Sequence, residues 1–171
     1  NALANRQLAK ADFSGVDATI KTALEKVAKK EDVHSAYSRL IYSKISNLPD
    51  SIYPSWNADK ALEEANKAYD IDHKPLYVHQ QALAYFVKKD YATAYDKFME
   101  LTKTPIRNGD LFYSAAQCKT QMKAPDAEIV ALLDSAIAVS PQPLNFVGAP
   151  YVLARATHYY NIGEYRKAVI D

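Results

Sequence analysis

A repeated spacing of small and aromatic residues constrains this chain more than any other feature of its sequence. Two sets of four residues share one internal spacing and stand 74 residues apart: Ala82, Tyr85, Tyr91 and Ala94, then Ala156, Tyr159, Tyr165 and Ala168. Ala4, Gln7, Phe13 and Val16 repeat the spacing with weaker chemistry. Small residues let two helices cross at about 8 Å between their axes, and aromatic residues beside them fill the remaining volume. The spacing therefore predicts stacked helical hairpins.

Helical periodicity extends along nearly the whole chain, and no stretch shows the sustained alternation of a strand. The segment Ser14–Asp17 looks like a capping box, and Asn57 and Asp90 look like N-caps. We expect helices at 2–11, 32–47, 76–88, 91–103, 110–122, 126–139 and 150–162, with others after Ser14, after Asn57 and from Glu164.

The pattern resembles the tetratricopeptide repeat, a 34-residue helix-turn-helix unit with small and aromatic residues at these positions. The approximate units are 2–30, 31–74, 75–107, 108–143 and 149–171, the last of them incomplete, within a single helical-repeat domain. The resemblance implies an all-α fold in which helix-turn-helix repeats stack into a right-handed superhelix, an α-solenoid.

Composition argues against several other classes of protein. With 21 basic and 20 acidic residues the net charge is +1, so the chain lacks the basic excess typical of nucleic-acid binders. No apolar run approaches the roughly 20 residues of a membrane span. A single cysteine, Cys118, allows neither an internal disulfide nor a cysteine-based zinc site. Because no catalytic or metal-binding motif is visible, we expect a non-catalytic protein with no cofactor and no metal.

The resemblance further implies that the first helices of successive repeats line a concave face that binds peptides or partner proteins. Helical spacing places one row of residues on each first helix. The rows are His79, Leu83 and Phe86, then Phe112, Ala116 and Lys119, then Leu153, Thr157 and Tyr160. We expect a protein or peptide partner on these residues. The alternative is that they pack against neighbouring helices.

A second hypothesis for function starts from the irregular segment between Pro49 and Asn57, which contains Tyr53 and Trp56. Long loops are uncommon and often functional. The chain would then be a ligand-binding or enzymatic domain that uses the helical frame and has a pocket near Trp56. In the competing interpretation, Trp56 fills the gap between adjacent repeats.

The two ends of the sequence suggest a fragment. The last helix begins like the second helix of a repeat and stops after Val169 and Ile170. We expect further helices to follow in the native protein, and self-association through the apolar C-terminal edge when they are absent. The start, Asn1-Ala2, fits removal of a tag or of a signal peptide, and on that ground we favour an exported protein over a cytoplasmic one.

Overall fold

The part of the chain that the structure describes is all-α, as the periodicity predicts. A computed structural model describes residues 12–49, 51–140 and 148–170, and within them it contains nine α-helices and no strand. The expected helix 2–11 lies outside these residues. Two compact units divide the chain, Asn1–Lys89 and Asp90–Asp171, hereafter unit 1 and unit 2. The division falls between the two helices of the predicted third repeat.

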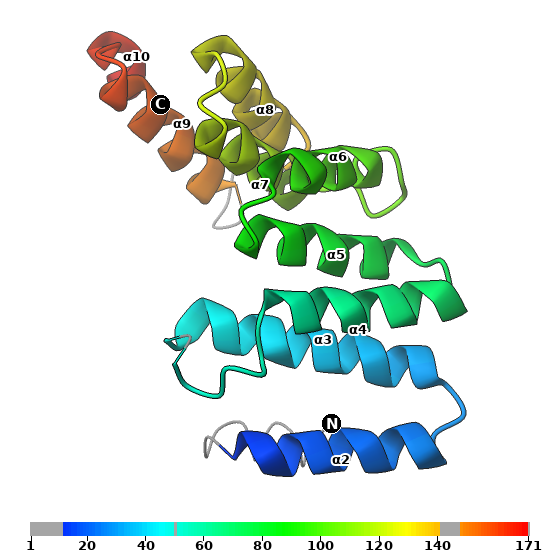
Figure 1. Cartoon of the computed structure of the whole chain (residues 1–171). Coiled ribbons are helices and arrows are strands. Elements are labelled where there is room, and N and C mark those ends of the chain that lie inside the picture. The colour runs from blue at the N-terminus through cyan, green and yellow to red at the C-terminus, as the bar shows by residue number, and fades with distance from the viewer. Residues whose placement is uncertain (1–11, 50, 141–147, 171) are drawn as a thin grey trace. The chain divides into compact units, whose positions relative to one another are not determined.

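Unit 1 is a set of consecutive antiparallel helices (Figure 1). They are α2 (Phe13–Lys26), α3 (Lys30–Asn47), α4 (Ala58–Ile71) and α5 (Pro75–Val87). α4 packs against both α3 and α5, and α3 also contacts α5 directly. α4 begins at the predicted cap, because the side chain of Asn57 accepts a hydrogen bond from the Lys60 backbone N–H at 2.9 Å.

The predicted capping box at Ser14 is wrong, because Asp12 caps α2. Its carboxylate accepts a hydrogen bond from the Gly15 backbone N–H at 3.0 Å, and Ser14 lies within the first turn and donates its hydroxyl to the same carboxylate. A carboxylate at this position also interacts favourably with the positive end of the helix dipole. The helix therefore starts earlier than the serine suggests.

A buried carboxylate links α3 and α4 in unit 1. Glu64 is only 3% exposed at its side chain and accepts hydrogen bonds from His34 Nδ1 at 2.6 Å and Lys67 Nζ at 3.0 Å. Lys60 Nζ lies 3.0 Å from the same carboxylate. Burial alone raises the pKa of Glu64, but these hydrogen bonds outweigh it, so the pKa lies below its ordinary value.

Unit 2 contains the helices on which the candidate site is built. They are α6 (Tyr91–Leu101), α7 (Gly109–Gln121), α8 (Asp126–Ala138), α9 (Ala149–Asn161) and α10 (Tyr165–Ile170). α6 begins at Asp90, the predicted cap. α7 and α8 form a hairpin, α9 packs on α8, and α10 packs on α9.

A close contact at the start of α7 fixes α7 and α9 relative to each other. A Cβ atom added to Gly109 would lie 2.5 Å from the Tyr151 ring on α9 and 2.9 Å from the Ala136 carbonyl oxygen on α8, so only glycine fits. Next to it, the Tyr151 hydroxyl donates to Asp110 Oδ1 at 2.6 Å. α9 is therefore held against α7 at one end.

Candidate functional site

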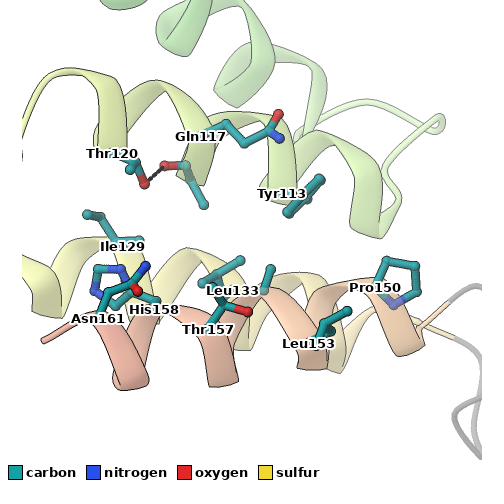
Figure 2. Close-up of a pocket in the computed structure, with 12 residues that line it drawn as sticks. Tyr113, Gln117, Thr120, Ile129, Leu133, Pro150, Leu153, Thr157, His158 and Asn161 are labelled. Carbon is teal, nitrogen blue, oxygen red and sulfur yellow. Dashed lines mark hydrogen bonds between the residues drawn. The ribbon is translucent and has the colours of Figure 1, made fainter. Parts of the chain in front are cut away.

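A groove of about 440 Å³ lies in unit 2 between α7, α8 and α9 (Figure 2). It is lined by Tyr113, Ala116, Gln117 and Thr120 of α7, by Ile129 and Leu133 of α8, and by Pro150, Leu153, Ala154, Thr157, His158 and Asn161 of α9. On each helix these residues recur at intervals of three or four, which is the spacing of a single face. The α9 wall is about 16 Å long at 1.5 Å per residue.

The groove has an apolar floor and a neutral polar rim. Ala116, Ile129 and Leu133 are almost fully buried and form one core cluster. Around them stand amides and hydroxyls, of which Gln117 and Asn161 are exposed. None of the twelve lining residues is Asp, Glu, Lys or Arg. A charged group entering the groove would lose water without meeting an opposite charge, so the lining suits an uncharged ligand.

His158 is the lining residue closest to acid–base chemistry. Its Nε2 lies 3.2 Å from Asp126 Oδ1, but the two atoms are not aligned for a hydrogen bond, and the nitrogen is buried. The lining also carries the hydroxyls of Tyr113, Thr120 and Thr157, but none of them is hydrogen-bonded to His158 Nε2, so no nucleophile is paired with a base through this nitrogen. Within residues 12–49, 51–140 and 148–170, no group of three or more His, Cys, Asp or Glu is placed to hold a metal ion.

A short side chain lines the groove at the position that matches a buried glutamine of unit 1. The 74-residue offset that matches Ala82 to Ala156 also matches Gln80 on α5 to Ala154 on α9. In unit 1, Gln80 is 4% exposed, and its Nε2 donates to Ser35 Oγ on α3 at 2.8 Å. In unit 2 the Ala154 side chain ends at Cβ and lines the groove. The position that joins two helices in unit 1 therefore leaves space in unit 2.

The residues predicted for a concave face lie in different surroundings. Leu153, which is 67% exposed, lines the groove together with Thr157 and Ala116. Phe112 instead lies in a buried cluster with Ala136 and Tyr151. Half-buried His79, Leu83 and Phe86 lie on α5 in unit 1.

Two other predicted residues lie beside the groove rather than in it. The ammonium of Lys119 lies 2.7 Å from Glu128 Oε2 and 4.5 Å from the centre of the Tyr95 ring. Tyr160 is 64% exposed and packs edge-on against Tyr165 at 5.4 Å, in a second groove between α9 and α10. The face that lines the groove is therefore rotated by about one residue from the predicted row.

Sequence reasoning missed most of the polar lining: Gln117, Thr120, His158 and Asn161. It also missed Ala154, for which a signal was present. Aligning the two best-matched repeats places a buried glutamine opposite an alanine, and such a loss of volume at a helix–helix contact indicates a cavity.

The segment around Trp56 is part of the core of unit 1. Trp56 is 1% exposed and packs edge-on against Phe13 at 5.3 Å and Tyr37 at 5.6 Å. Asp17 accepts hydrogen bonds from Trp56 Nε1 at 2.8 Å, from the Tyr53 hydroxyl at 2.6 Å and from the Tyr37 hydroxyl. Burial raises the pKa of Tyr37, and the hydrogen bond to Asp17 raises it further. The tryptophan therefore anchors its loop against α2 and α3.

No protein-family model matches this chain, and no curated protein matches it significantly. Among the helices that the structure describes, none combines the length and apolar composition needed to cross a lipid bilayer.

Proposed function

We propose that this chain is a non-catalytic helical-repeat protein of the tetratricopeptide type, and that it binds a segment of a partner protein between α7 and α9. The observation that carries the proposal is the α7–α8–α9 groove, which is apolar at its floor, neutral and polar at its rim, and open at Ala154. In this proposal the hairpins stack into the right-handed superhelix that the resemblance to the tetratricopeptide repeat implies.

The chemistry of the rim favours a polypeptide as the ligand. The side-chain amides of Gln117 and Asn161 each carry a donor and an acceptor, as a peptide unit does. An extended segment has backbone N–H and C=O groups free to pair with them, whereas those of a helix are already paired. A wall of about 16 Å matches roughly five extended residues at 3.3 Å each. Apolar side chains of the segment would then reach the floor formed by Ile129 and Leu133.

Filling the groove tests the proposal. Ala154→Gln introduces the residue that occupies the matching position in unit 1, and Ala131→Gln makes the same change at an exposed position of α8 outside the groove. Proteins captured from an extract of the source organism would be quantified by mass spectrometry for the native chain and both variants. Circular dichroism melts check that both variants fold.

We expect at least one partner that the native chain and Ala131→Gln retain and that Ala154→Gln loses. Identical capture by all three folded proteins would contradict binding in the groove.

A further inference from the structure

The two long walls of the groove, α7 and α9, run in the same direction (Figure 2). Their beginnings are held together, because the Tyr151 hydroxyl donates to Asp110 and the Tyr113 ring lies 5.7 Å from the Tyr151 ring, centre to centre. Figure 2 places Tyr113 at the end where both helices begin and Thr120 at the other end, together with Asn161. The chemistry of the groove can therefore be followed from one end to the other.

The end where α7 and α9 begin, hereafter the anchor end, presents mainly carbon. Its rim consists of Tyr113 of α7 and of Pro150, Leu153 and Ala154 of α9. Pro150 and Leu153 are exposed, whereas Tyr113 and Ala154 pack on the buried cluster that floors the groove. An apolar side chain placed here would cover Leu153. A charged one would lose water and find, among these side chains, only the Tyr113 hydroxyl.

The opposite end, hereafter the amide end, presents hydrogen-bonding groups. Thr120 of α7 and His158 and Asn161 of α9 surround Ile129 there (Figure 2). The Asn161 amide offers both donors and an acceptor, and the Thr120 hydroxyl, which donates to the Ala116 carbonyl at 2.9 Å, can still accept. An apolar side chain would cover these groups without replacing their hydrogen bonds to water. The amide end therefore favours a polar side chain.

The distance between the two ends sets a spacing in the bound segment. Leu153 and Asn161 are eight residues apart on α9, which is about 12 Å along the helix axis. An extended chain covers about that distance in four residues, at about 3.3 Å each, and residues four apart point to the same side of the chain. A single extended segment can therefore place one side chain at each end.

We propose that the segment bound between α7 and α9 is recognised at two points: a large apolar side chain at the anchor end, and a polar side chain four residues away, in either direction, at the amide end. The inference rests on the proposed function, because it names the chemistry of the segment that the groove takes.

A library of random 12-residue peptides, displayed and selected on the full chain, tests the inference. We expect the selected peptides to share a Leu, Ile, Met or Phe with a Ser, Thr, Asn or Gln four positions away. In the best peptide, changing the apolar residue to Ala should weaken binding about tenfold or more by fluorescence anisotropy, because less apolar surface is buried at the anchor end.

Exposed residues of the chain allow each end to be tested separately. Leu153→Ala shortens the wall of the anchor end, and Ile170→Ala removes a side chain of the same size from an exposed position of α10 outside the groove. We expect Leu153→Ala to weaken peptide binding about threefold or more and Ile170→Ala to leave it unchanged. Asn161→Leu keeps the size of the side chain at the amide end and removes its hydrogen-bonding groups.

Double-mutant cycles then show which residues meet. Leu153→Ala should couple to the change of the apolar peptide residue, and Asn161→Leu to the change of the polar one, whereas the two crossed pairs should be additive. Circular dichroism melts check that the variants fold.

The outcomes separate the two proposals. Peptides that Ala154→Gln releases and Ala131→Gln retains, but whose apolar residue does not couple to Leu153 or couples to Asn161 instead, would overturn the two-point inference and leave the groove as the binding site. If no peptide is selected, or if Ala154→Gln binds the selected peptides as well as Ala131→Gln does, the proposed function fails and the inference fails with it.

Discussion

Replacing Asp17 with alanine should destabilise unit 1 strongly, because one carboxylate satisfies three aromatic hydrogen-bond donors. Trp56 and Tyr37 are buried, so water cannot readily replace the lost acceptor for either. Tyr53 is partly exposed and can turn to solvent. The loss is therefore mainly that of two buried groups.

The magnitude follows from those two groups. Each buried donor left unsatisfied costs about 1–3 kcal/mol, which gives roughly 2–6 kcal/mol for the pair. Asp17 is itself only half-buried, so water that enters the vacated site lowers the upper limit to about 5 kcal/mol. Asp17→Asn keeps one acceptor oxygen and should fall between the native chain and Asp17→Ala.

Urea titration followed by the fluorescence of Trp56 measures the effect, because this residue is the only tryptophan in the sequence and reports on unit 1. Glu25→Ala, at an exposed position of the same helix, is the control. Substitutions at exposed positions typically change the free energy of unfolding by up to about 0.5 kcal/mol. If Asp17→Ala lowers that free energy by no more than this amount beyond Glu25→Ala, the Asp17 hydrogen bonds do not hold the Trp56 loop.

Other buried groups give similarly specific expectations. Because folding lowers the pKa of Glu64, its ionised carboxylate stabilises the folded chain above about pH 4.3, the ordinary pKa of a glutamate. This stabilisation is lost as the pH falls through the pKa of Glu64 in the folded chain. Glu64→Gln should cost about 2–4 kcal/mol at pH 7 and flatten the acid limb of a urea-stability profile; an unchanged profile would contradict this account. Gly109→Ala should cost about 1–3 kcal/mol in thermal melts, despite the better helix propensity of alanine, because its methyl group would overlap the Tyr151 ring. Burial raises the pKa of the Cys118 thiol to about 12, so iodoacetamide at pH 8 should modify it only when unit 2 opens; fast labelling of the native chain would show a looser α7.

The features that follow from local sequence were predictable. The helices, and the caps Asn57 and Asp90, depend on residues a few positions apart, and within the described residues the structure places helices close to the expected ranges and both caps as expected. At the start of α2, Asp12 and Ser14 both offer a side-chain oxygen that could cap the helix. Which of them does so depends on where the chain enters the helix. Local spacing alone does not settle such a competition.

The candidate site was less predictable, because it depends on how helices pack. Spacing identifies a stripe of residues on α7, but whether Phe112 or Tyr113 faces the groove depends on the rotation of α7 against α8 and α9. That rotation is set by contacts distant in sequence, such as Gly109 with Tyr151. The groove is also lined at a position where the matched segments differ, Gln80 in one and Ala154 in the other, whereas repeat analysis looks for what repeats share.

The location of the bound segment is tested most directly by the alanine methyl NMR spectrum of the chain, recorded while a peptide selected on the chain from a random displayed library is added. We expect the methyl signals of Ala116 and Ala154, which line the groove, to shift in proportion to occupancy, and that of Ala131 to stay in place. Saturable shifts that leave Ala116 and Ala154 unmoved and fall on methyl groups of unit 1 would place the binding site elsewhere and contradict the proposed function.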